Sequence, residues 1–257
     1  MSTSTGRYQI ISQWLIQIGE AGLFLLRILA VIPRSLRYPR EMVRQVWFVG
    51  AMSLIILMVC GLFVGMVLAL QLYHVLSIFG GAAVTGTVVA ISIYRELGPV
   101  VTALLFAGRA GTAITAEIGL MRTTDQLAAM ELMAVDPLAY VVVPRFIAGL
   151  VAMPLLCGVF CAQGILGGHL VAVSWLGIDN GSFWSNMTAT VDVWKDIMDG
   201  VVWKSLAFGL VVSLIAVFQG YTAPSTSEGV AYATTRTVVA SSIAILLLDF
   251  MLTIFLM

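Results

Sequence analysis

The sequence predicts an all-α integral membrane protein, in which an N-terminal interfacial amphipathic helix precedes five transmembrane helices and a short cytoplasmic helix lies between the second and third. Three observations support this fold class. Of the 257 residues, 60% are hydrophobic and 10% are charged, whereas soluble domains carry about 25% charged residues. Five apolar runs are long enough to cross a bilayer. Lys and Arg alternate between the loops as the positive-inside rule requires.

The first element is the segment from Tyr8 to Leu29, whose apolar residues recur at helical spacing while its glutamines and Glu20 lie largely elsewhere around the wheel. We expect a helix that lies in the membrane interface and stops at Pro33. A first, oblique transmembrane helix is the alternative, and its glutamines and glutamate disfavour it on insertion cost. Residues 1–45 then form a cytoplasmic and interfacial region, and residues 46–257 form the transmembrane domain.

The apolar runs account for the transmembrane helices and comprise residues 46–72, 82–107, 146–173, 197–218 and 238–257. Arg34, Arg37, Arg40 and Arg44 cluster ahead of the first run, which marks that side as cytoplasmic. The next loop has no Lys or Arg, whereas the loop at 108–145 is again basic. With five spans, the two termini lie on opposite sides. The outer loop that follows the third run is acidic and aromatic, and we expect a brief helix near residues 183–191.

Two charges lie near mid-depth of the second run. A charge at that depth costs about 3 kcal/mol, and Arg95 and Glu96 cannot neutralise each other because adjacent helical residues point in different directions. Each therefore needs a partner outside its own helix. Pro99 also frees the backbone carbonyl of Arg95, four residues back, next to Gly98. These features predict a polar, water-accessible site within the membrane.

Asp249 lies in the middle of the last run, where an acidic residue is a functional or pairing residue by default. Its candidate partners are Arg95, Arg109 and Arg236.

The loop between the second and third runs predicts a short helix from Asp125 to Val135. Thr123 and Gln126 have capping-box spacing for its start, and Asp136 before Pro137 ends it. Four residues share one face of this helix: Leu127, Met130, Glu131 and Ala134. A lever that docks into a soluble partner and a helix that rests on the membrane surface fit this pattern equally well.

Small and large apolar residues form two further patterns. Gly61 with Gly65, and Gly164 with Gly168, provide faces where helices can approach closely, and packing within the chain is favoured over packing between copies. A stripe near the outer end of the first run consists of Leu68, Leu72, Val75, Leu76 and Phe79. By itself such a stripe indicates lipid contact or packing more often than substrate binding.

Catalytic and cofactor signatures are missing from the sequence. It has no Gly-rich phosphate loop, no HExxH and no GxSxG. His74 and His169 are isolated, which disfavours a metal site. The formal net charge is zero and gives no indication of nucleic-acid binding.

Several ordered motifs resemble the MlaE (YrbE) family of ABC transporter permeases, over nearly the whole chain. They are Arg95-Glu96-Leu97-Gly98-Pro99-Val100-Val101, Phe106-Ala107-Gly108-Arg109-Ala110-Gly111, Ala116-Glu117-Ile118-Gly119-Leu120-Met121, Met130-Glu131-Leu132-Met133-Ala134-Val135-Asp136-Pro137, Pro144-Arg145, Gly220-Tyr221 and Ala233-Thr234-Thr235-Arg236-Thr237. Asp125 stands where the resemblance leads us to expect Glu, which shortens the side chain and keeps its charge.

The resemblance implies a homodimeric, multi-pass permease in a bacterial inner membrane, with its N-terminus cytoplasmic and its C-terminus periplasmic. It implies transport of phospholipids between inner and outer membranes, which maintains outer-membrane lipid asymmetry. The implied partners are an ABC ATPase (MlaF) that binds the ATP, a STAS-domain protein (MlaB) and a ring of MCE-domain subunits (MlaD). No catalytic residue, metal, cofactor or nucleic acid is implied for the permease itself.

The resemblance also implies two sets of site residues. The lipid-binding set is Leu68, Leu72, Val75, Leu76, Phe79, Arg95, Glu96 and Leu97. The set in or beside the coupling helix, which transmits motion from the ATPase, is Glu117, Arg122, Asp125, Leu127, Met130, Glu131 and Asp136. Two other function classes use the same charges: an intramembrane lipid-modifying enzyme and a proton-coupled secondary carrier. Either should be active alone, whereas the permease should be inert until an ATPase is bound.

Overall fold

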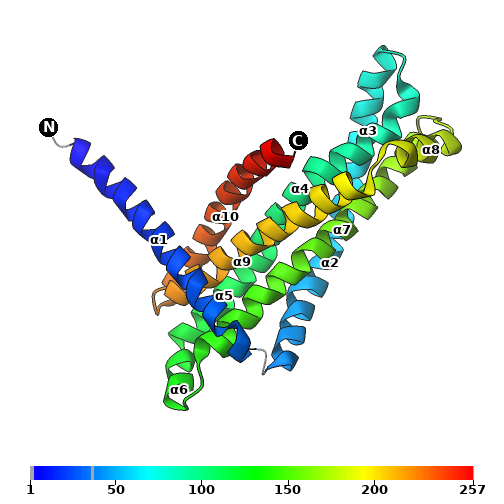
Figure 1. Ribbon diagram of the computed structural model, residues 1–257. Coiled ribbons are helices and arrows are strands. Elements are labelled where there is room, and N and C mark those ends of the chain that lie inside the picture. Colours follow the sequence, from blue (N-terminus) through cyan, green and yellow to red (C-terminus); the bar gives the residue numbers. More distant parts are fainter. Residues whose placement is uncertain (1–2, 36–37, 257) are drawn as a thin grey trace.

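The protein is described by a computed structural model for residues 3–35 and 38–256, with side chains for 19–35, 38–192 and 194–255. All regular structure in these ranges is helical, in agreement with the predicted class. Long helices lie side by side in an elongated bundle, with α3 and α8 at one end and α6 at the other (Figure 1). Helix α6 is therefore separated from α3 and α8 by the length of the bundle.

Five stretches among the described residues are long and apolar enough to cross a membrane, which confirms the predicted number of spans. They are Pro39–Ile78, Ala82–Thr123, Leu138–Ser174, Trp194–Thr222 and Ser227–Phe255. All five extend beyond the apolar runs at one or both ends, because the helices continue into polar segments. The longest continuous helix among the spans is α2 (Pro39–Ile78), and the last span lies in α10 (Ser227–Leu256).

The other spans are built from shorter helical pieces. The second comprises η1 (Ala82–Val84), α3 (Thr85–Ser92), η2 (Ile93–Leu97), α4 (Gly98–Phe106), η3 (Ala107–Gly111) and α5 (Thr112–Thr123). The third comprises η4 (Leu138–Val142) and α7 (Val143–Ser174), and the fourth comprises η5 (Val193–Trp203) and α9 (Lys204–Thr222). Segments η2 to η5 are π-helical, a conformation that is found frequently at functional sites.

The N-terminal helix α1 (Thr3–Ser35) crosses the bundle near one end (Figure 1). Phe24 is buried against α9, with its ring 5.6 Å from that of Phe218 and 5.5 Å from that of Tyr221. The helix continues two residues past Pro33, where we predicted its end. Its placement in the membrane interface stays a prediction, and the side chains before residue 19 lie outside the described residues.

Helices α2 and α7 pack closely through small residues. The buried positions of α2 recur every fourth residue and end in Gly61, Gly65 and Ala69. A Cβ atom on Gly65 would overlap the backbone of Gly164, and one on Gly167 would overlap the carbonyl of Leu62. The predicted glycine faces therefore pack against each other within the chain, which confirms the favoured alternative.

Helix α8 (Asn180–Thr190) confirms the brief helix expected in the outer loop. It begins after Asp179, whose carboxylate accepts a hydrogen bond from the backbone N–H of Ser182 at 2.8 Å. This is the usual chemistry of a helix N-cap.

Candidate functional site

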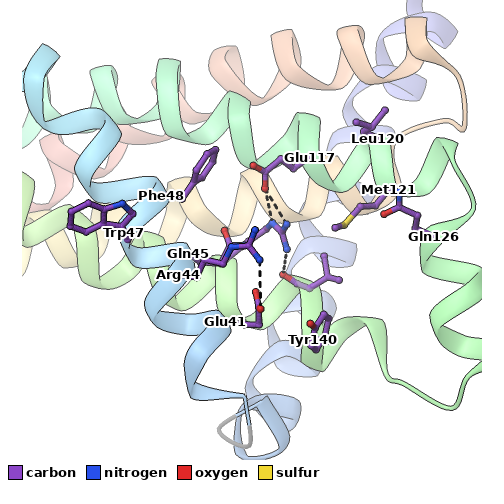
Figure 2. A pocket seen from close by; sticks show the side chains of 12 residues that line it. Glu41, Arg44, Gln45, Trp47, Phe48, Glu117, Leu120, Met121, Gln126 and Tyr140 are labelled. Carbon is purple, nitrogen blue, oxygen red and sulfur yellow. Dashed lines mark hydrogen bonds and ion pairs between the residues drawn. The ribbon is translucent and has the colours of Figure 1, made fainter.

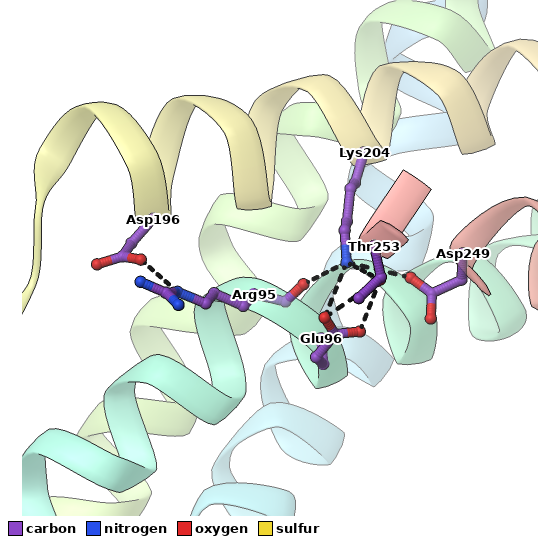
Figure 3. A network of polar contacts seen from close by, with 6 residues as sticks. All are labelled: Arg95, Glu96, Asp196, Lys204, Asp249 and Thr253. Atoms are coloured by element: carbon purple, nitrogen blue, oxygen red, sulfur yellow. Dashed lines mark hydrogen bonds and ion pairs between the residues drawn. The ribbon is translucent and has the colours of Figure 1, made fainter. Parts of the chain in front are cut away.

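Lys204 is the centre of a charged cluster inside the membrane-spanning region. Its side chain is 3% exposed, and its Nζ lies 3.2 Å from Oε1 of Glu96 and 3.4 Å from Oδ1 of Asp249. Thr253 Oγ1 accepts a further bond from Nζ at 2.8 Å. Figure 3 shows these side chains converging from three segments: η2, the first residue of α9, and the last part of α10. The buried ammonium is thus balanced by two carboxylates, as a charge in a low-dielectric interior requires.

The backbone at Arg95 completes the coordination of Lys204. Pro99 has no N–H to donate to the Arg95 carbonyl, as the sequence predicted. Nζ of Lys204 donates to that oxygen at 2.7 Å, within π-helical η2. The interruption of the helix therefore creates a binding site for the lysine.

The Arg95 side chain has a different partner. Its Nε donates to Oδ1 of Asp196 at 2.5 Å, and Asp196 is fully buried in η5. Oδ2 of Asp196 accepts the backbone N–H of Asp192 at 2.8 Å, which holds the carboxylate in place. The expectation that Arg95 and Glu96 each require a partner from another segment is confirmed.

The prediction that Asp249 pairs with Arg95, Arg109 or Arg236 was wrong, because its carboxylate contacts Lys204. The side chains of Arg95 and Arg109 bond Asp196 and Ser53. Arg236 lies thirteen residues from Asp249 on the same helix, about 20 Å along its axis. Lys204 was not among the partners predicted from the sequence. Its position inside the apolar run 197–218 was the signal that could have identified it.

A cavity of about 310 Å³ opens beside this cluster. Its lining is Arg95, Glu96, Lys195, Asp199, Gly200, Lys204 and Thr253. Three of these residues are cationic and two are anionic, so the lining carries one net positive charge at neutral pH. The Arg95 side chain is 41% exposed and uses Nε for Asp196, which leaves its Nη groups for a ligand. Such a site can bind an anionic group such as a phosphate.

The predicted apolar stripe lies apart from this cavity within one chain. Leu68 and Leu72 are partly buried against a cluster that includes Val89 and Ile93, whereas Val75 and Phe79 are exposed. Leu76 and Leu97 are half-buried. The structure therefore brings Arg95 and Glu96 to the cavity, and it does not bring the stripe there.

The cytoplasmic helix predicted for the 108–145 loop is α6 (Gln126–Leu132), but its start differs from the prediction. Thr123 Oγ1 donates to the carbonyl of Leu120 at 2.8 Å instead of capping α6. Asp125 takes a left-handed backbone conformation, with φ 54°, between α5 and α6. Asp adopts this conformation more readily than most residues with a side chain, which gives a backbone reason for a short acid at this position.

The end of α6 also differs from the prediction. The N–H of Val135 bonds the carbonyl of Met130 at 2.9 Å, and that of Ala134 bonds Glu131 at 3.0 Å. With Ala134 at φ 58°, these bonds form a Schellman motif that stops the helix. Asp136 instead accepts the N–H of Leu138 at 3.0 Å, at the start of η4.

The residues that were predicted to share one face of α6 differ in how far they are exposed. Leu127 is buried and Met130 is half-buried, so these two residues anchor the helix. Glu131 is exposed beside Leu132 and Met133, which are 90% and 68% exposed. Leu127 and Glu131 lie one turn apart on the same side of α6, as predicted, but only Leu127 is buried. Ala134 lies beyond the end of α6, and the exposed surface at this end of the helix is formed by the segment from Glu131 to Met133.

Two other residues of the predicted coupling set are bonded within the chain. Glu117 Oε2 accepts bonds from Nε and Nη2 of Arg145 at 3.2 and 3.0 Å, and Arg122 donates to the Tyr221 carbonyl. Both Glu117 and Arg145 line a cleft of about 570 Å³, and Figure 2 shows Glu117 there across from residues of α2. These bonds attach α5 to α7 and α9, so a movement of α6 would be carried into the spans.

Arg109 makes a second cross-helix attachment. Its Nη1 donates to Ser53 Oγ at 3.0 Å and to the carbonyls of Phe48 and Val49 at 3.4 and 3.3 Å. The guanidinium lies 5.8 Å from the centre of the Phe48 ring. The π-helical segment η3 is thereby fastened to the N-terminal part of α2.

The fold and the site are those of a polytopic transport protein. The described part of the chain has five candidate spans, a charged cavity within them and a projecting helix at one end of the bundle (Figure 1). The family profile described as Permease MlaE matches residues 42–255. The chain belongs to the MlaE permease family. It is accordingly a multi-pass ABC transporter permease subunit and a non-catalytic transport component, which removes the enzyme and secondary-carrier alternatives.

Individual relatives agree with this assignment. The chain is 51% identical over 236 residues to the Intermembrane phospholipid transport system permease protein MlaE of Haemophilus influenzae, covering 92% of this chain and 90% of that protein. A Probable ABC transporter permease protein of Rickettsia bellii is 37% identical over 238 residues, covering 92% and 90%. Protein TRIGALACTOSYLDIACYLGLYCEROL 1, chloroplastic, of Arabidopsis thaliana is 31% identical over 235 residues, covering 91% and 65%.

Proposed function

We propose that this permease moves phospholipids between the inner and outer membranes of a bacterial envelope, and so maintains the lipid asymmetry of the outer membrane. The name of the Haemophilus influenzae relative supports the substrate class. The observation that carries the proposal is the cavity next to Lys204, because it offers cations to a phosphate at a depth where only a functional site would retain them.

The charges suggest how the headgroup is held. Lys204 is bonded to Glu96 and Asp249, so an incoming phosphate meets a lysine whose charge is already balanced. Arg95 has one carboxylate partner and a partly exposed guanidinium, and it is the better first ligand for phosphate. We assign Arg95 to phosphate binding, and Lys204 to fixing the helices around the cavity.

The acyl chains need an apolar surface that this cavity lacks. We propose that two copies of the chain form a homodimer in which the stripe from Leu68 to Phe79 and Leu97 complete the lipid site. The exposure of Val75 and Phe79 in the single chain supports this placement.

The energy source is proposed to be a separate ABC ATPase (MlaF) that docks on α6. The exposed segment from Glu131 to Met133 supports this, because it combines one acid with two large apolar side chains at the end of the bundle. Partnership with a STAS-domain protein (MlaB) and an MCE-domain ring (MlaD) rests on the family resemblance. The same holds for location in the inner membrane, with a cytoplasmic N-terminus and a periplasmic C-terminus.

The role of Arg95 is tested by Arg95→Gln, with Arg95→Lys as the matched variant that keeps a cation. The assembled transporter is purified, its phospholipid per chain is measured by mass spectrometry, and its lipid-stimulated ATP hydrolysis is recorded. We expect low lipid content for Gln and an intermediate value for Lys, because Lys cannot form the bidentate contact. Thermal unfolding is followed in parallel. Wild-type lipid content and transport in a folded Arg95→Gln protein would contradict the assignment.

A further inference from the structure

A narrow apolar groove runs along the surface between α2 and α7, near the end of the bundle that holds α6. Its volume is about 330 Å³, and its walls include Trp47 and Leu54 from α2 and Leu155 from α7. Its floor contains small residues, Gly50 and Ala51 of α2, opposite Ala152 of α7. Because these side chains fill little of the space between the helices, a furrow remains between the larger neighbours.

The groove has the depth of one membrane leaflet. On α2 it extends from Val43 to Leu54, which is eleven residue-to-residue steps and about 16 Å at about 1.5 Å per step. Half of a hydrocarbon core of about 30 Å is about 15 Å. The groove is therefore about as long as half of the hydrocarbon core is thick, which is enough for much of one acyl chain.

The end of the groove nearest the headgroups is basic. A second hollow, lined by Arg40 and Arg44 among others, adjoins the groove and shares Val43 and Trp47 with it. Both arginines are exposed. The ion pair of Arg44 with Glu41, at 3.8 Å, is a long and exposed contact, so it is weak. Tryptophan prefers the depth of the lipid headgroups, which fits the position of Trp47 between the arginines and the groove.

We propose that this groove binds an anionic phospholipid of the leaflet that faces Arg40 and Arg44, with its phosphate at the two arginines and one acyl chain along the floor. Charge and shape both favour this occupant, because the basic end and the apolar furrow match the two parts of one lipid. The lining shares no residue with the cavity at Arg95. The inference requires only that the chain spans a membrane, so it does not depend on the transported substrate.

The test measures binding of phosphatidylglycerol and phosphatidylcholine to the purified transporter by native mass spectrometry. Arg40→Gln with Arg44→Gln removes the basic end, and Arg27→Gln on the exposed face of α1 is its control. Each basic residue near an anionic headgroup contributes about a fivefold gain in affinity, so the double variant should bind phosphatidylglycerol about thirtyfold more weakly. Its affinity for phosphatidylcholine should change little.

The apolar part is tested by Ala51→Leu, which fills the floor. Its control is Ala162→Leu, an exposed position of α7 outside the lining. We expect Ala51→Leu to release both lipids and Ala162→Leu to release neither. Phosphatidylglycerol binding that is equal in the wild type and in all four variants would overturn the proposal. So would a changed oligomeric state in Ala51→Leu with lipid binding intact, because the groove would then be an interface between copies of the chain.

Discussion

Lys204→Met is the substitution that tests the charged cluster most directly. Methionine is similar in length and apolar, so the change removes the ammonium and keeps most of the packing. It deletes the four bonds from Nζ to the Arg95 carbonyl, Glu96, Asp249 and Thr253, at 2.7, 3.2, 3.4 and 2.8 Å. Two carboxylates and one carbonyl are then left without that cation.

The magnitude follows from the exposure of the two acids. Removing one partner of a fully buried ion pair costs about 3–5 kcal/mol. The Glu96 and Asp249 side chains are 39% and 19% exposed, so solvent screens part of the loss and we expect the lower end, about 3 kcal/mol. For a chain of this size about 3 kcal/mol corresponds to a fall of about 6–12 °C in the unfolding temperature.

The assay is thermal unfolding of the purified protein in detergent, followed by tryptophan fluorescence. The matched variant is Lys204→Met combined with Glu96→Gln and Asp249→Asn, which removes the acids that the lysine neutralised. If uncompensated charge causes the loss, this triple variant should recover most of it. An unfolding temperature for Lys204→Met within about 2 °C of wild type would refute the reasoning, and a triple variant as unstable as the single one would attribute the loss to packing.

Three further predictions concern other regions. Glu131→Lys should abolish lipid-stimulated ATP hydrolysis without affecting membrane insertion, because Glu131 is exposed on α6; unchanged stimulation and unchanged ATPase co-purification would argue against docking there. Gly65→Ala should lower the unfolding temperature by about 4–8 °C, since its Cβ would overlap the backbone of α7 and overpacking costs about 2 kcal/mol. The control Gly158→Ala has open space around the new Cβ and should leave the unfolding temperature unchanged. Cysteines at Ser4 and at the exposed Arg34 should both resist an impermeant thiol reagent added from the periplasm, and labelling at Ser4 alone would show that the first segment spans.

Much of the architecture follows from local sequence patterns. Five spans could be predicted because the length and polarity of a helix that crosses hydrocarbon are constrained residue by residue. The need of Arg95 and Glu96 for outside partners could be predicted for the same reason, since an unpaired charge at mid-depth is too costly. The carbonyl freed by Pro99 was predictable from covalent structure alone.

The identities of those partners could not be predicted in this way. Lys204 meets Glu96 across 108 residues of sequence, and Arg95 meets Asp196 across 101. Which charges meet depends on how each helix is rotated about its axis and where the helices cross. The spacing of residues within one helix does not contain that information. The wrong partner for Asp249 has this cause.

The cytoplasmic helix shows the same division at short range. Its existence was evident from the helical spacing of Leu127, Met130 and Glu131. Its boundaries were set by left-handed backbone conformations at Asp125 and Ala134. Glycine is the usual residue in this conformation, and neither position holds one, so the sequence did not indicate these boundaries. The sequence by itself thus determined the membrane spans and the demand for charge pairing, because each depends on local polarity and length. Only the tertiary structure decided which residues satisfy that demand, because pairing depends on the relative positions of helices that are distant along the chain.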